Sequence, residues 1–94
     1  MEYLVTSHSP TDYYLHLLGI ARLKAGDLPR AIDALRAACN LNPEQVHYWY
    51  ALGKALERQE NNDAVAAYER ALRLKPGYTK ARFALKRLRK ANGA

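Results

Sequence analysis

The chain has 94 residues, of which 49% are hydrophobic and 26% are charged, with a net charge of +6. This length allows one domain with a modest core, and this composition is that of a folded protein, not a disordered one. No apolar run reaches the roughly 18 residues of a membrane span, and the first residues lack the pattern of a signal peptide. The single cysteine, Cys39, excludes an internal disulfide, and we expect a cytoplasmic protein.

Five segments have the periodicity of helices, and capping or helix-breaking residues separate them. The first should begin within residues 9–12, where a serine precedes a proline, and should end at about Ala25, before Gly26. Asp27 can cap the second helix, which carries a narrow apolar stripe: Ala31, Ile32, Leu35, Ala38 and Cys39. No structure is predicted for residues 1–8, because they show no usable period.

The third helix is expected to have Asn42 as its N-cap and Pro43 in its first turn, and to run to about Gln59. The fourth should follow residues 61–63 and end near Leu74, before a break at residues 76–77. The last helix should run from about Tyr78 to Ala91 and stop at residues 92–93. Its apolar side should pack on the preceding helix: Ala81, Ala84, Leu85, Leu88 and Ala91. These segments predict an all-α protein.

The helical segments contain an internal repeat. Residues 15–19 match residues 49–53 at an offset of 34, and residues 40–43 match residues 73–76 at an offset of 33. The offset changes from 34 to 33 between Gly53 and Ala64, so the second repeat is one residue shorter there, most simply in the turn. Repetition at this spacing is typical of helical repeat proteins, in which each unit packs on its neighbours.

The repeated residues resemble the tetratricopeptide repeat family, whose pattern is tryptophan, leucine, glycine, alanine, an aromatic residue, alanine and a closing proline. The second repeat fills every position: Trp49, Leu52, Gly53, Ala64, Tyr68, Ala71 and Pro76. The first repeat has Leu15 in the tryptophan position and Leu35 in the aromatic position. The resemblance implies an α-solenoid. It has an N-terminal tail (1–8), two helix hairpins within 9–76 (about 12–45 and 46–78), and a basic C-terminal capping helix with its tail (77–94).

Gly19 and Gly53 lie inside predicted helices, where glycine costs about 1 kcal/mol relative to alanine. We therefore expect each glycine to remove a side chain at a place where the paired helix approaches closely. Small residues of the paired helices are expected to face them: Ala31, Ala38, Ala64 and Ala71.

In this family the first helix of each repeat lines a concave groove that commonly holds a peptide. Carried over by position, the contact residues here are aromatic and basic: Tyr13, His16, Ile20, His47, Tyr50, Lys54, Lys80, Phe83 and Arg87. Such a surface suits a protein or peptide partner with acidic and apolar side chains. Where family members clamp the C-terminal carboxylate of a chaperone, only Lys80 has a matching residue type, so that function is not expected.

No constellation of residues indicates an enzyme, a metal site or a cofactor. Cys39 with His8, His16 or His47 could be imagined as a nucleophile and base, but Cys39 lies on an apolar stripe and is better interpreted as core. The histidines lack the spacing of metal ligands. We expect an interaction module, an adaptor or scaffold, and not an enzyme.

Two features leave alternatives open. Residues 80–94 hold six basic residues and no acid, so the last helix could bind nucleic acid or another acidic surface, or could simply be a solvated cap. The first helix is apolar nearly all round over residues 13–21, which indicates burial on more than one side. Its cover could come from residues 1–8, from a second copy in a homo-oligomer, or from a partner.

Overall fold

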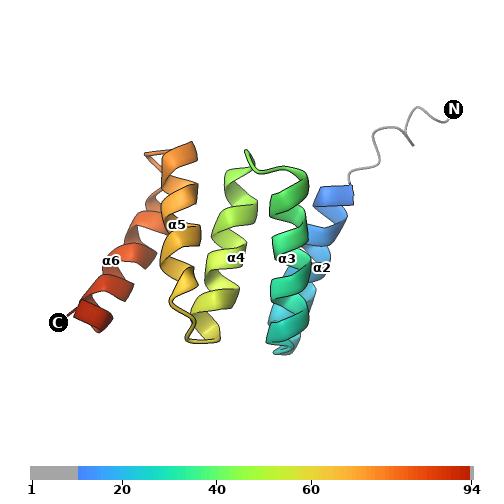
Figure 1. The fold of residues 1–94 in the computed structure, drawn as a ribbon, viewed down its shortest axis with the longest axis horizontal. Coiled ribbons are helices and arrows are strands. Elements are labelled where there is room, and N and C mark those ends of the chain that lie inside the picture. Colours follow the sequence, from blue (N-terminus) through green and yellow to red (C-terminus); the bar gives the residue numbers. More distant parts are fainter. Residues whose placement is uncertain (1–10, 94) are drawn as a thin grey trace, which may run out of the picture.

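The computed structural model describes residues 11–93, which form five helices and no strand within that range. These are α2 (Thr11–Ala25), α3 (Leu28–Leu41), α4 (Val46–Arg58), α5 (Asp63–Leu74) and α6 (Thr79–Gly93). α2 packs on α3 and α4 packs on α5, so that two hairpins stand side by side, and α6 follows α5 at the end of the row (Figure 1). The predicted all-α solenoid is confirmed, while the predicted tail and the serine cap before Thr11 lie outside the described residues.

The observed helix ends correct the prediction at two places. Asn42 ends α3 and does not cap α4, because its backbone N–H donates to the Ala38 carbonyl at 3.0 Å, and α4 begins only after Gln45. The last helix ends at Gly93, two residues beyond the predicted Ala91 and within the predicted stop at residues 92–93. Ala91, expected on the packed side of α6, is exposed, because the C-terminal end of α6 diverges from α5 (Figure 1).

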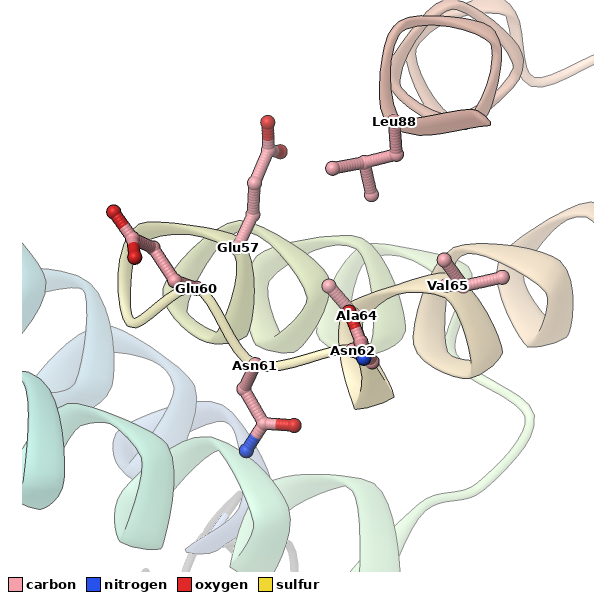
Figure 2. A pocket seen from close by; sticks show the side chains of 7 residues that line it. All are labelled: Glu57, Glu60, Asn61, Asn62, Ala64, Val65 and Leu88. Carbon is pink, nitrogen blue, oxygen red and sulfur yellow. The ribbon is translucent and has the colours of Figure 1, made fainter. Parts of the chain in front are cut away.

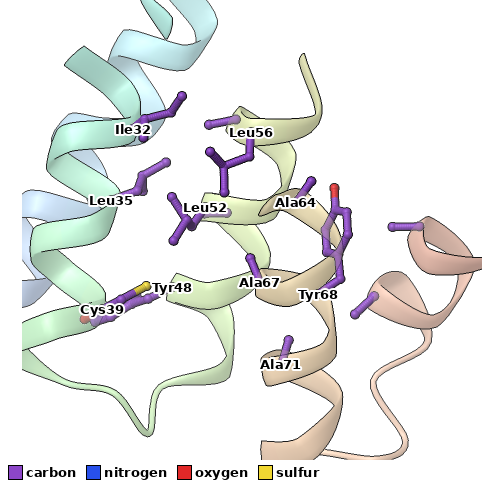
Figure 3. Close-up of a cluster of buried hydrophobic side chains, with 14 of the residues drawn as sticks. Ile32, Leu35, Cys39, Tyr48, Leu52, Leu56, Ala64, Ala67, Tyr68 and Ala71 are labelled. Carbon is purple, nitrogen blue, oxygen red and sulfur yellow. The ribbon is translucent and has the colours of Figure 1, made fainter. Parts of the chain in front are cut away.

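The core lies between the hairpins and runs through all five helices. Its largest fully buried side chains include Tyr68, Leu35 and Leu56, and no polar or charged side chain is buried among the described residues. The predicted stripe of α3 is buried along its whole length and faces α4, as Figure 3 shows for Ile32, Leu35 and Cys39. Burial raises the pKa of the Cys39 thiol to about 12, so the thiol stays protonated and inert at neutral pH.

Both helix-interior glycines sit where a neighbouring helix approaches closely, as predicted, but the residues that face them are large. A β-carbon on Gly53 would lie 2.6 Å from the Tyr68 ring, and one on Gly19 would lie 2.5 Å from Leu35. Of the four alanines expected to face the glycines, Ala31 contributes its backbone oxygen at 3.3 Å from the β-carbon position of Gly19, behind the nearer Leu35 side chain. Each glycine therefore makes a notch that receives the bulky residue of the paired helix.

The two hairpin turns begin identically and then differ by one residue. Gly26 has φ 85° and Glu60 has φ 60°, and in both repeats the next backbone N–H donates at 2.9 Å to the carbonyl five residues earlier. The missing residue of the second repeat therefore falls between Asn61 and Ala64, in the first turn of α5. As a result, only Asn62 and Asp63 correspond to residues 28–30, and Leu28, which packs against the core in the first hairpin, has no apolar counterpart in the second.

Candidate binding groove

An open hollow of about 240 Å³ lies between the first helices of the two repeats and the start of α6. Its lining residues come from α2, α4, α6 and the residue just before α6: His16, Ile20, His47, Tyr50, Ala51, Lys54, Tyr78 and Lys80. Six of the nine predicted contact residues are among them. We call this hollow the groove.

Helical spacing brings these side chains together. On α4, residues 47, 50, 51 and 54 recur at intervals of three and four, which places them on one face of the helix. On α2, His16 and Ile20 are four residues apart, so they lie on the same face of the helix, one turn from each other. Because α2 and α4 occupy the same position in successive hairpins, their matching faces form one continuous surface.

Three aromatic rings form the centre of the groove. The Tyr78 hydroxyl lies 3.2 Å from His47 Nδ1, within hydrogen-bonding distance, and the two ring centroids are 5.7 Å apart. Tyr50 meets Tyr78 edge to face, with ring centroids 5.5 Å apart at an angle of 78°. Burial raises the pKa of Tyr78, which therefore stays neutral and keeps its hydroxyl proton. These contacts hold the rings rigidly and leave an apolar face open to a ligand.

The charge of the groove is positive, since none of its eight lining residues is acidic. Lys54 and Lys80 are exposed, and the Lys54 ammonium lies 5.6 Å from the Tyr50 ring centre. His16 is half-buried, and its buried Nδ1 has no hydrogen-bond partner in the described part of the chain. Desolvation, aided by His47, lowers the pKa of His16, so at neutral pH the positive charge comes from the lysines.

Three predicted contact residues lie outside the groove lining. Tyr13 is half-exposed and stacks beside His16 with ring centroids 6.2 Å apart, at the margin of the groove. Phe83 is exposed on α6. Arg87 makes a bidentate ion pair with Glu57, at 2.7 Å to each carboxylate oxygen, and this hydrogen bonding raises the pKa of Arg87. Arg87 thereby joins α6 to α4.

Tyr78 is the groove residue that sequence reasoning missed. The sequence predicts Tyr78 only as the first residue of the last helix, but it lies just before α6 and points its ring at His47 and Tyr50. An aromatic residue at the cap position of a groove-lining helix is the signal that could have revealed it.

A second hollow, of about 420 Å³, lies beside the turn between α4 and α5 and below Leu88 of α6 (Figure 2). It lies at the first turn of α5, where the second repeat lacks an apolar counterpart of Leu28. Among its polar residues, Glu57 already accepts hydrogen bonds from Tyr68 at 2.7 Å and from Arg87. Glu57 is therefore engaged within the repeat array. Within residues 11–93 no cluster of three or more potential ligands could hold a metal ion.

The basic residues of α6 are partly engaged within the repeat array. Arg89 pairs with Glu69 at 2.7 Å, Arg87 pairs with Glu57, and the Arg82 guanidinium donates to the Pro76 carbonyl at 3.4 Å. Half of the six basic side chains that suggested a nucleic-acid surface thus have partners inside the protein. Each engaged arginine is less available to a phosphate group.

Comparison with known proteins identifies the fold's family. The model of the tetratricopeptide repeat matches residues 16–79. The chain belongs to the tetratricopeptide repeat family. Crystal structures of MamA superpose with TM-scores of 0.86 and 0.84 at 28% identity; the first match covers 95% of this chain and 53% of MamA. This tetratricopeptide module is thus a protein–protein interaction module by family, and the predicted resemblance is confirmed.

Longer relatives contain similar repeats. The peroxisomal targeting signal receptor of Candida glabrata is 36% identical over 69 residues, which are 72% of this chain and 12% of the receptor. The PEX5-related protein of Homo sapiens is 40% identical over 68 residues, which are 71% of this chain and 11% of that protein. The chain therefore spans about an eighth of the length of these relatives. None of the described helices is long and apolar enough to cross a membrane. A cytoplasmic location and the absence of enzymatic activity stay predictions.

Proposed function

We propose that the tetratricopeptide module binds a peptide segment of a partner protein in the groove, and that the segment carries acidic and apolar side chains. The observation that carries this proposal is the convergence of six predicted contact residues, together with Tyr78, on one hollow without an acidic lining residue. By binding such a segment in the groove, the module would act as an adaptor or scaffold for the partner protein.

The chemistry of the groove supports this choice of ligand. The edges and faces of Tyr50 and Tyr78 offer apolar contact area that is already held in place, so little side-chain entropy is lost on binding. Lys54 and Lys80 flank these rings and attract carboxylates, which raises the rate of encounter and fixes the orientation of the peptide. An extended segment that alternates acidic and apolar residues can satisfy both kinds of contact.

The relatives support a peptide as the ligand class. The Candida glabrata protein is named as a receptor for a targeting signal, and such a signal is part of another protein's chain. The repeats shared with this receptor make up 12% of its length. What the two chains share is a type of repeat that can hold a protein segment.

The test uses a fluorescein-labelled peptide that alternates glutamate with leucine, and the same peptide with glutamine in place of glutamate. Fluorescence anisotropy should show binding of the glutamate peptide, and Lys54→Glu should weaken it about tenfold. Lys86→Glu is the matched control, because Lys86 is exposed on α6, lies outside the groove and undergoes the same change of charge. Its affinity should stay within about twofold of wild type.

The same pair of variants separates the groove from the basic last helix, which is the alternative site for an acidic partner or nucleic acid. Loss of binding in Lys86→Glu with full binding in Lys54→Glu would move the function to α6. Equal, small effects of both variants would show that net charge alone attracts the peptide, and the groove proposal would fail.

A further inference from the structure

We propose that the outer edge of the first repeat binds the same edge of a second copy of this chain, so that two chains associate about a two-fold axis. This first-repeat edge is the side of α2 and α3 that faces away from α4, and its central residues are Tyr14, Leu17, Leu18, Ala21, Ala34 and Ala37. It is distinct from the groove, whose α2 residues His16 and Ile20 point elsewhere.

The internal repeat identifies this edge as a surface built to be covered. At an offset of 34 residues, the four apolar edge positions of α2 correspond to four residues of α4 that are all buried: Tyr48, Ala51, Leu52 and Ala55. In α4 the first hairpin packs over them. In α2 the same face is open within the described residues, where Tyr14 is 63% and Leu17 is 47% exposed. Exposed apolar side chains gathered in this way are typical of an interface.

The edge is also hollow. A depression of about 320 Å³ has an apolar floor and a charged rim, and its lining residues are Leu15, Leu18, Arg22, Arg30, Asp33, Ala34 and Ala37. On the second repeat, the counterparts of Leu18 and Arg22 are Leu52 and Leu56, which meet the side chains of α3 (Figure 3). The open depression therefore has the place and the chemistry of a site for a packed helix.

The charges on the rim favour a second copy in the head-to-head arrangement. Arg22 and Arg30 are positive and lie 3.6 and 3.7 Å from Asp27 of their own chain, whereas Asp33 is negative and forms no ion pair with another side chain in residues 11–91. A two-fold axis can bring Asp33 of each copy near an arginine of the other, so the edge is complementary to itself. A head-to-tail contact would instead bring Lys86 and Lys90 of α6 toward these arginines.

Apolar area outside the depression extends the same surface. Leu41 is 58% exposed, and it lies four residues beyond Ala37 and seven beyond Ala34, on one stripe of α3. Tyr14 and Leu17 flank the depression on α2. Covering these three side chains removes large apolar surface from water, which is the main favourable term in association.

Sedimentation equilibrium of the full chain at rising concentration tests the proposal. The apparent mass should rise from 10.6 kDa toward twice that value. Tyr14→Lys should raise the dissociation constant at least about tenfold. Phe83→Lys is the matched control, because Phe83 is also 63% exposed but lies on α6 at the other end of the molecule. Circular dichroism should show that both variants keep their helices.

Charge reversal gives a second readout. Asp33→Lys and Arg30→Glu should each weaken the dimer, and an equimolar mixture of the two variants should regain wild-type association, because opposite charges then meet again at the interface. Failure of the mixture to associate would overturn the head-to-head arrangement.

Three other results would overturn the proposal. The first is a wild-type chain that keeps a mass of 10.6 kDa at every concentration. The second is equal weakening by Tyr14→Lys and Phe83→Lys, which would indicate a head-to-tail contact. The third is dimerisation only after removal of residues 1–10, which would mean that those residues, and not a second copy, occupy the edge in the full chain.

Discussion

The two repeats share one pattern but differ in how completely neighbours surround them. The second lies between α3 and α6, and its Trp49 indole donates to the Pro43 carbonyl at 2.8 Å and lies beneath the Arg70 guanidinium. The first has Leu15 in the same position, and its outer edge is open within the described residues. In a repeat array, stability comes from the contacts between neighbours as much as from each unit. The second repeat should therefore be the more sensitive to substitution.

The largest difference is expected at the tryptophan position. Trp49→Ala should lower the free energy of unfolding by about 4 kcal/mol, because it removes a large ring together with its hydrogen bond and its contact with Arg70. Leu15→Ala at the matching position should lower the free energy of unfolding by only about 2 kcal/mol, because Leu15 is smaller than Trp49 and lies at the open edge of the first repeat. Urea denaturation followed by circular dichroism measures both. Equal costs would contradict the view that the second repeat is the better packed.

The next largest effect is expected at the notch of the second repeat. Gly53→Leu should lower the free energy of unfolding by about 3 kcal/mol, because its side chain meets the fully buried Tyr68 ring. Tyr68 cannot move easily, since its hydroxyl donates to Glu57 at 2.7 Å. Lys54→Leu, one residue along the helix, is exposed and serves as the control. Equal melting temperatures for the two variants would rule out this packing scheme.

A smaller change in stability is expected in the turns, where one substitution should stabilise the protein. Glu60 adopts the left-handed backbone conformation that Gly26 adopts in the first repeat. Glu60→Gly should therefore stabilise the protein by up to about 1 kcal/mol, whereas Gly26→Ala should destabilise it by a similar amount. Thermal unfolding measures both changes. A loss of stability in Glu60→Gly would mean that the Glu60 side chain contributes more than its backbone strain costs.

The smallest effect is expected from pH. Desolvation lowers the pKa of His16 in the folded protein, so the unfolded chain binds a proton more readily. Stability should therefore be constant above about pH 7 and fall as the pH drops below the ordinary histidine pKa of about 6.5. His16→Gln should reduce this dependence, while His47→Gln, at an exposed residue, should leave most of it. If the dependence of stability on pH were unchanged in His16→Gln, another titratable group would be responsible for it.

The sequence predicts the architecture well because the repeat pattern encodes packing directly. Periodic apolar residues gave the five helices, and glycine inside a helix correctly indicated a close approach. The side chains nearest to the glycines, Leu35 and Tyr68, were not predicted, because spacing alone does not tell which side chain enters a notch. The end of α6 lies two residues beyond the predicted Ala91, because asparagine and glycine lower helix propensity without preventing a helical backbone.

The groove is less predictable, because its composition depends on contacts between distant residues. Helical spacing brought His16, Tyr50 and Lys54 to one surface, as their positions in the repeat implied. Arg87 lies outside the groove lining and pairs with Glu57, a residue 30 positions earlier, and no local sequence pattern predicts this pairing. Tyr78 joined it because the chain bends before α6, which brings the ring against His47.

Amide chemical-shift mapping by NMR tests the groove assignment most directly. On titration with the glutamate–leucine peptide, we expect the largest shifts at the groove residues of three helices: His16, Ile20, His47, Tyr50, Lys54 and Lys80. The amides of α3 and α5, and of Lys86 and Lys90, should shift little. Shifts concentrated on α6 beyond Lys80, or on the first-repeat edge with an unperturbed groove, would contradict the account.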